Sequence, residues 1–271
     1  GIVHTEAWEG YGLDPGTVAG SMLLKRLQTP DEVAGVIAFC LSPAGDYITG
    51  TTIAADGGWD LVVEAESGTV WVEFIYQIIG RGTETLARLT PGDKVECLGP
   101  LGKSFDLGAA EGREVALVAG GAGSPALYIL AAALVHRQIP TRLFLGGASR
   151  GDLCGLDDFR ELLGADRVLT ATIDGSEGTT GFVTGPLEEY LDSAGEPLIY
   201  ACGPDPMLHR VAAIAAARNL PAQLSLEAPM ACGYGICVGC AVPVRHECPE
   251  GFIYQKVCTD GPVFWSRDLA W

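Results

Sequence analysis

Four cysteines near the C-terminus constrain the fold of this chain more than any other feature. Three follow a C-x4-C-x2-C pattern and the fourth comes after a gap of seventeen residues; they are Cys232, Cys237, Cys240 and Cys258. This is the plant-type spacing of a [2Fe–2S] cluster, in which one tight loop supplies three thiolates and a later strand or turn supplies the fourth. The spacing therefore predicts a small C-terminal domain built around an iron–sulfur cluster.

Glycines in the same loop suit that chemistry. Gly233, Gly235 and Gly239 let the backbone wrap closely round a cluster and direct N–H groups at its sulfurs, which raises its reduction potential. The alternatives are a zinc site and ordinary buried thiols, although zinc usually takes its cysteines in C-x2-C pairs. Cys248 competes with Cys258 for the fourth position, and the sequence leaves that choice open.

Composition limits the partners and the compartment. A chain of 271 residues holds two domains and has room for a small third. Its net charge of −17 argues against nucleic acid or an anionic membrane as partner and suits docking to a basic redox protein. Nine cysteines, an odd number concentrated toward one end, do not form a disulfide framework, so we expect a reducing, cytoplasmic location.

The middle of the chain alternates between strand and helix patterns. Such alternation predicts a parallel sheet covered by helices. The uncharged stretch over 115–135 has the length of a membrane span, but a glycine turn divides it into strand, turn and helix. The expected strands are 115–119, 141–145, 168–172 and 198–201, and the expected helices are 126–137, 157–163, 185–191 and 207–219.

A glycine-rich turn follows the first of these strands. A dinucleotide pyrophosphate needs backbone N–H groups and a helix N-terminus with no side chains in the way. Gly120, Gly121 and Gly123 meet that need, although they do not form the G-x-G-x-x-G pattern and a purely structural turn is the alternative. We therefore expect a nucleotide to bind beside this turn.

Loops after the other strands support the same location, because ligands of open α/β sheets bind beside the carboxyl ends of strands. Cys202–Pro204, with Cys202 and Gly203 at its start, follows one strand, and Asp174–Thr179 follows another. Ser149 and Arg150 come after the second strand, where they are placed to meet the adenosine ribose. An arginine there suits a 2′-phosphate or is simply a solvated surface charge, so the choice between NADH and NADPH stays open.

Residues 1–58 resemble the C-terminal part of a short-chain dehydrogenase/reductase. The resemblance rests on a helical pattern over 31–41, a strand pattern over 47–58, and the Thr49-Gly50 and Asp56–Gly58 positions. The catalytic Tyr-x-x-x-Lys pair of that family is absent, so we expect no dehydrogenase activity from this segment. We interpret it as a structural remnant, or as the product of a gene fusion or of a misassembled reading frame.

From about residue 61 the chain resembles a second family, the electron-transfer subunit of class 1B dihydroorotate dehydrogenase within the ferredoxin reductase superfamily. Strand patterns over 69–79 and 93–98 flank a short helix expected over 84–89. The resemblance rests on motifs that occur in order, namely Gly80–Thr83, Pro91–Asp93, Leu98–Gly102, Gly120–Gly123, Asp174–Ser176, Gly181–Thr184, Cys202–Met207, Ser225–Glu227, the cysteine loop and Val257–Phe264.

The resemblance implies a ferredoxin-reductase-like α/β fold in four parts. Residues 1–58 are the dehydrogenase-like fragment, 59–110 an incomplete antiparallel flavin barrel, 111–222 the NAD domain and 223–271 the [2Fe–2S] domain. It also implies that Gly80, Arg81, Gly82 and Thr83 approach FAD. By the same resemblance, Gly121, Gly123 and Cys202 line the nicotinamide nucleotide site and the four cysteines hold the cluster.

The function implied is electron transfer between NADH, FAD, the [2Fe–2S] cluster and an FMN-bearing catalytic subunit in a hetero-oligomer. The flavin motif of the family, Arg-Pro-x-Ser/Thr, should precede residue 62, but no arginine in the chain is followed by proline. A related conduit serving a ferredoxin or sulfide-type partner, and a non-enzymatic iron–sulfur carrier that has lost FAD, are the alternatives.

Overall fold

The computed structural model describes residue 78, residues 80–93, residue 95 and residues 101–271. The patterns expected over 31–41, 47–58, 69–79 and 93–98 lie outside the described residues, apart from residues 78, 93 and 95. The chain divides into two compact units. One comprises Gly1–Leu101 with Pro229–Gly239, and the other comprises Gly102–Ala228 with Cys240–Trp271.

The larger unit is built on a seven-stranded sheet with the order β4-β3-β2-β1-β5-β6-β9. Strands β1 to β6 pair in parallel, and β9 pairs with β6 in the antiparallel direction. The strands are β1 Val115–Gly120, β2 Thr141–Gly147, β3 Val168–Thr172, β4 Thr179–Thr180, β5 Leu198–Cys202, β6 Ala222–Ser225 and β9 Val263–Trp265. The chain order reverses between β1 and β5, which is where open α/β sheets bind their ligands.

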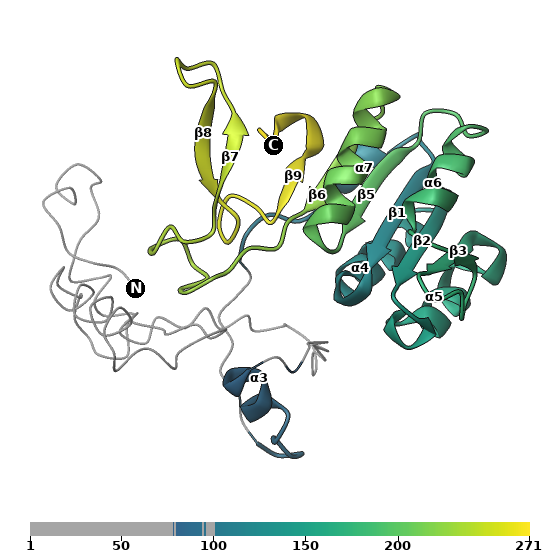
Figure 1. Ribbon diagram of the computed structural model, residues 1–271, viewed down its shortest axis with the longest axis horizontal. Helices are drawn as coiled ribbons and strands as arrows, with labels where there is room; N and C mark the ends of the chain where they lie inside the picture. The colour runs from purple at the N-terminus through teal and green to yellow at the C-terminus, as the bar shows by residue number, and fades with distance from the viewer. Residues whose placement is uncertain (1–77, 79, 94, 96–100) are drawn as a thin grey trace, which may run out of the picture. The chain divides into compact units, whose positions relative to one another are not determined.

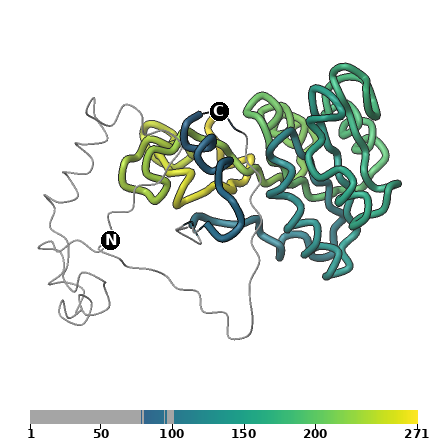
Figure 2. Tube along the Cα trace, turned by 90° about the horizontal axis from the view of Figure 1, so that it is seen from below, coloured from purple at the N-terminus to yellow at the C-terminus, as the bar shows by residue number. Residues whose placement is uncertain are grey.

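Four helices cover this sheet, as the strand–helix alternation predicts. They are α4 Ser124–His136, α5 Leu156–Leu163, α6 Thr184–Leu191 and α7 Asp205–Ala217. Figure 1 shows them packed along the strands, and in the perpendicular view of Figure 2 the same teal-to-green segments still form one body. The predicted α/β class and parallel sheet are confirmed.

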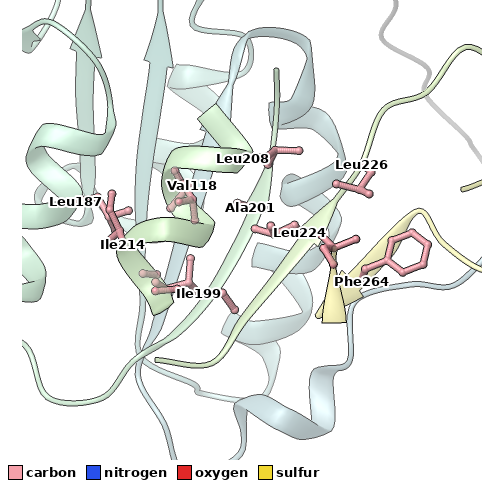
Figure 3. Close-up of a cluster of buried hydrophobic side chains, with 14 of the residues drawn as sticks. Val118, Leu187, Ile199, Ala201, Leu208, Ile214, Leu224, Leu226 and Phe264 are labelled. Carbon is pink, nitrogen blue, oxygen red and sulfur yellow. The ribbon is translucent and has the colours of Figure 1, made fainter. Parts of the chain in front are cut away.

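Both faces of β1 are buried, which explains its continuous apolar sequence. Leu117 belongs to the core beneath α4 and α5, together with Leu127 and Phe159. Val118 points the other way, into the core beneath α6 and α7 that contains Leu187 (Figure 3). Within the described residues, none of the helices has the length and apolar character needed to cross a membrane.

Two further elements lie outside the parallel sheet. In the larger unit, β7 Ala241–Arg245 and β8 Phe252–Lys256 form an antiparallel hairpin. In the other unit, α3 spans Arg81–Leu86 and so begins three residues before the predicted helix. It begins early because Thr83 Oγ1 accepts a hydrogen bond from the Gly80 backbone N–H (3.2 Å) and donates one to the Gly80 carbonyl (3.0 Å), which closes the first turn.

Candidate nucleotide and iron–sulfur sites

A cavity of about 700 Å³ lies at the carboxyl ends of the parallel strands. Its walls come from the loops that follow β1, β2, β3 and β5 and from the first turns of α6 and α7. The lining residues are Gly120, Gly121, Gly146, Gly147, Ala148, Asp152, Ile173, Gly181, Phe182, Val183, Thr184, Pro204, Pro206, Met207 and Arg210. The volume lies within the range of pockets that hold cofactors.

The glycine turn forms one wall of this cavity. Gly120 ends β1, and a Cβ atom there would lie 2.9 Å from Pro204 Cδ and 2.8 Å from Met207 Sδ. A Cβ atom on Gly123 would overlap the Cys202 carbonyl group, so the turn after β1 packs directly on the turn after β5. Gly121 has φ +51° and open space beside it, which leaves its backbone accessible from the cavity.

Helix α4 starts directly behind the turn. Gly123 occupies its N-cap position, and no side chain caps the first turn. Ser124 directs its hydroxyl to the carbonyl oxygens of Gly121 (3.1 Å) and Cys154 (2.9 Å), so it does not satisfy the helix N–H groups either. The backbone N–H groups of the first turn of α4 therefore remain as donors, and such donors suit a pyrophosphate. Of the three predicted glycines, Gly120 and Gly121 line the cavity, whereas Gly123 is buried against the turn after β5.

Cys202 and Gly203 lie on the facing turn. Cys202 is the last residue of β5 and is 5% exposed, and Gly203 approaches so closely that its Cβ would lie 3.0 Å from the Gly120 nitrogen. Burial raises the pKa of the Cys202 thiol to about 11, against the opposing effect of a hydrogen bond with Ser225. At neutral pH this side chain is therefore an uncharged thiol at the junction of the two turns.

The buried thiol gives a pH prediction. Between pH 9 and pH 11 the unfolded chain loses the Cys202 proton while the folded chain keeps it, so the stability that this group contributes falls as pH rises through that window. We expect the free energy of unfolding to fall by about 2 kcal/mol more between pH 8 and pH 11 in the natural chain than in Cys202→Ser. Urea unfolding at the two pH values measures this, and equal pH dependence in the two proteins would contradict it.

The cysteine loop contributes Cys232 and Cys237 to the smaller unit. The backbone N–H of Cys237 donates to Cys232 Sγ and that of Gly239 donates to Cys237 Sγ, both at 3.4 Å. Burial of Cys232 opposes its ionisation, but N–H groups of the loop, with that of Cys237 first, lower its pKa to about 7. Backbone donors directed at these sulfurs are the arrangement that the glycine pattern predicts for cluster ligands.

Backbone strain in this loop was not visible in the sequence. Gly233 and Gly235 have φ +76° and +93°, as their residue type allows, but Val238 also has a positive φ of +51°. A β-branched residue rarely adopts that conformation, which costs of the order of 1–3 kcal/mol. The loop between Cys237 and Cys240 is thus held in a tight turn that its sequence does not favour.

Cys240 and Cys258 lie side by side in the larger unit. Both are buried, at 2% and 5% exposure, and their sulfurs are 3.2 Å apart. That separation is too long for a disulfide bond of about 2.05 Å. Two sulfurs on one tetrahedral metal with bonds of about 2.3 Å lie about 3.8 Å apart, so a small shift adapts the pair to a shared iron. The chemistry and spacing of this pair fit a metal.

Cys248, the competitor for the fourth position, lies elsewhere in the same unit. It belongs to the turn between β7 and β8, where its thiol contacts the Phe252 carbonyl oxygen at 3.1 Å. The contact between Cys240 and Cys258 therefore favours Cys258 as the fourth ligand. In the part of the chain that the structure describes, no group of three or more histidine, cysteine, aspartate or glutamate side chains stands in metal-binding geometry.

Comparison with known proteins shows matches to three family models. Residues 117–213 match an oxidoreductase NAD-binding domain, and residues 227–270 match the iron–sulfur cluster binding domain of dihydroorotate dehydrogenase B. Residues 1–60 match the model described as enoyl-(acyl carrier protein) reductase, in agreement with the dehydrogenase-like pattern of this segment.

Among solved structures, the chain is similar to one reported as an NADH-dependent reduced ferredoxin-NADP oxidoreductase that performs flavin-based electron bifurcation. The identity is 28%, the TM-score is 0.59, and the match covers 72% of this chain and 67% of that one. This likeness confirms the predicted ferredoxin-reductase-like fold.

Two curated relatives are both described as the electron transfer subunit of dihydroorotate dehydrogenase B (NAD(+)). The protein from Caldanaerobacter subterraneus subsp. tengcongensis is 38% identical over 72% of this chain and 74% of its own length. The one from Bacillus caldolyticus is 43% identical over 72% of this chain and 73% of its own. With its nucleotide cavity and its cysteine pairs, this chain belongs to the family of dihydroorotate dehydrogenase B electron transfer subunits.

Proposed function

We propose that this chain is an NAD-linked oxidoreductase subunit that passes electrons between NADH, FAD and a [2Fe–2S] cluster. Its partner is the FMN-containing catalytic subunit of dihydroorotate dehydrogenase, so it serves pyrimidine biosynthesis in a hetero-oligomer. The observation that carries this proposal is the presence of a nucleotide-sized cavity and of a buried thiol pair suited to a metal in a chain whose reported curated relatives are such subunits.

In this proposal the nucleotide lies along the strand ends. Gly120 and Gly121, which line the cavity, receive the pyrophosphate together with the uncapped N-terminus of α4, where Gly123 is the N-cap residue. Cys202 and Gly203 face the nicotinamide part from the end of β5, and the uncharged thiol of Cys202 places no charge there. The residues thus bind and orient the nucleotide, while the hydride chemistry belongs to the cofactors.

The cluster ligands in this proposal are Cys232, Cys237, Cys240 and Cys258. The cluster supplies one-electron redox chemistry, which the protein tunes through backbone hydrogen bonds and burial. Backbone N–H groups already reach the sulfurs of Cys232 and Cys237, and Cys240 and Cys258 are shielded from solvent. Thiolate ligands need a reducing compartment, so we infer a cytoplasmic location.

FAD is assigned to the Gly80–Thr83 turn, with Arg81 and Gly82 at the start of α3. This turn is one half of the flavin signature of the family, and the Arg-Pro-x-Ser/Thr half is absent from the chain. When bound there, FAD would supply the chemistry that links a two-electron hydride donor to a one-electron cluster. Its content in the purified protein is therefore the first quantity to measure.

The test begins with protein purified without oxygen and analysed for FAD and iron. We expect about one FAD and about two irons per chain, and NADH should bleach the oxidised cluster and produce the electron paramagnetic resonance signal of the reduced one. Iron without flavin, together with a cluster that NADH does not reduce, would overturn the proposal and leave a non-enzymatic iron–sulfur carrier.

A second candidate is a related conduit whose partner is a ferredoxin. It is favoured by the likeness to a structure described as NADH-dependent reduced ferredoxin-NADP oxidoreductase. One assay of cluster reduction distinguishes the two candidate functions. Dihydroorotate should reduce the cluster only when an FMN-containing dihydroorotate dehydrogenase subunit is added, whereas the second candidate requires reduction by ferredoxin alone.

A further inference from the structure

The loops after β2 and β3 meet at one end of the nucleotide cavity. Ala148 and Asp152 line the cavity from the loop after β2, and Ile173 lines it from the loop after β3. The loops are joined by a backbone hydrogen bond from the Asp174 N–H to the Ala148 carbonyl (3.1 Å) and by one from the Arg150 N–H to Ser176 Oγ (2.8 Å). This end of the cavity is therefore built as one rigid corner.

Glu177 forms ion pairs with two arginines at this corner, Arg150 and Arg160. One carboxylate oxygen pairs with the Arg150 guanidinium, and the other accepts a hydrogen bond from Arg160 Nη2 at 2.7 Å. Hydrogen bonds with Arg160 and the charge of Arg150 lower the pKa of Glu177, so it is ionised at neutral pH. The Glu177 side chain is 16% exposed, whereas the Arg150 side chain is 57% exposed, so the pair lies at the surface of the corner.

The backbone fixes Glu177 in this position. Its N–H donates to Thr172 Oγ1 at 3.1 Å, and its carbonyl accepts from the same hydroxyl at 2.9 Å. Gly178, the next residue, lies against Thr170 with φ +67°, so no side chain fits there without displacing the strand. These contacts anchor the backbone of Glu177, and the two arginines orient its carboxylate.

The charges at this corner bear on which nucleotide it accepts. A 2′-phosphate on the adenosine ribose requires an arginine whose guanidinium is available, whereas a 2′-hydroxyl needs an acceptor. Arg150 lies between the cavity-lining residues Ala148 and Asp152 in the loop after β2, and its charge is offset by Glu177. Asp152, whose carboxylate is held by the Ser149 N–H (2.9 Å) and hydroxyl (2.8 Å), adds a negative charge at the cavity wall.

We propose that Glu177 is a specificity-determining residue, which selects NADH over NADPH by withholding Arg150 from the 2′-phosphate. The inference rests on the proposed nucleotide site and adds to it the residue that sets the preference. Arg210, which lines the cavity itself, is paired with Glu188 at 2.6 Å, and we assign it no part in reading the 2′ position.

The test compares 5′-ADP with 2′,5′-ADP, which differ only by the 2′-phosphate, by calorimetry on the full chain. In Glu177→Gln we expect 2′,5′-ADP to bind about tenfold more tightly, since one charge-assisted contact becomes available, and 5′-ADP to change by less than about twofold. The gain should vanish in the double variant Arg150→Ala/Glu177→Gln. In the matched control Glu188→Gln, which releases Arg210 instead, the ratio of the two affinities should stay that of the natural chain.

The results distinguish a failure of the proposed nucleotide site from a failure of the role proposed for Glu177. If the natural chain fails to bind 5′-ADP, the site is wrong and the inference falls with it. If 5′-ADP binds but Glu177→Gln leaves the ratio unchanged, or the gain survives removal of Arg150, only the role of Glu177 is overturned. The single variant Arg150→Ala tests the inference even if Glu177→Gln fails to fold. We expect Arg150→Ala to bind 2′,5′-ADP as tightly as the natural chain does. Weaker binding would show that Arg150 already contacts the 2′-phosphate in the natural chain and would overturn the inference.

Discussion

Replacing Cys258 by serine should remove the iron–sulfur cluster, whereas replacing Cys248 by serine should leave it in place. Cys258 Sγ lies 3.2 Å from Cys240 Sγ in a buried pair, while the Cys248 thiol is engaged with the Phe252 carbonyl. A serine hydroxyl remains protonated at neutral pH and is a poor ligand for iron. We expect Cys258→Ser to lose more than about nine tenths of the iron of the natural chain, as measured by iron analysis and by visible absorbance.

Binding of 5′-ADP serves as the control in this experiment. It reports on the strand ends of the parallel sheet, so retention of binding in Cys258→Ser shows that the loss of iron is not global unfolding. The opposite pattern, iron lost in Cys248→Ser and kept in Cys258→Ser, would assign the fourth ligand to the turn between β7 and β8.

Introducing a methyl group at Gly123 should disable the nucleotide site and destabilise the sheet beneath it. The added Cβ would lie 2.6 Å from the Cys202 carbonyl carbon and 2.7 Å from the Gly203 nitrogen, both backbone atoms that cannot move aside without separating the two turns. We expect Gly123→Ala to lower the free energy of unfolding by about 2–3 kcal/mol and to weaken 5′-ADP binding at least about tenfold. Urea unfolding and calorimetry measure the two effects.

Gly185→Ala is the matched substitution for that experiment. Gly185 is the second residue of α6, and no atom lies within 4 Å of the position its Cβ would take. Alanine is the better helix former, so stability should stay the same or rise by up to about 1 kcal/mol. Equal losses in the two alanine variants would mean that the close approach of the two turns is unimportant.

The sequence predicted the four helices and the strands β1, β2, β3 and β5 to within two residues at each end. It did so because buried parallel strands are continuous apolar runs, and glycine or proline marks their ends. Strands β6 and β9 escaped prediction because they are only four and three residues long, too short to show a strand pattern. Gln223 in β6 is buried only because its side-chain oxygen accepts a hydrogen bond from the Asp106 N–H (3.0 Å), a partner far away in the chain.

In the sites, too, features set by the local sequence were predictable, whereas features that depend on contacts between distant residues were not. Glycines around a phosphate and cysteines around a metal were predictable, because the backbone and ligand chemistry restrict those positions to one residue type. The pairing of Glu177 with Arg150 was not, since it joins residues 27 positions apart through the packing of two loops. The choice of Cys258 over Cys248 likewise depended on which thiol the fold brings to Cys240.

The two outer strands of the parallel sheet have a consequence for solubility. Exposed strand edges pair with other chains and so promote aggregation, and short edge strands limit that risk. Strand β4 covers one side with two residues, and β9 covers the other with three, running antiparallel to β6. Deleting β9, Val263–Trp265, would leave β6 as an open template for amyloid-like association.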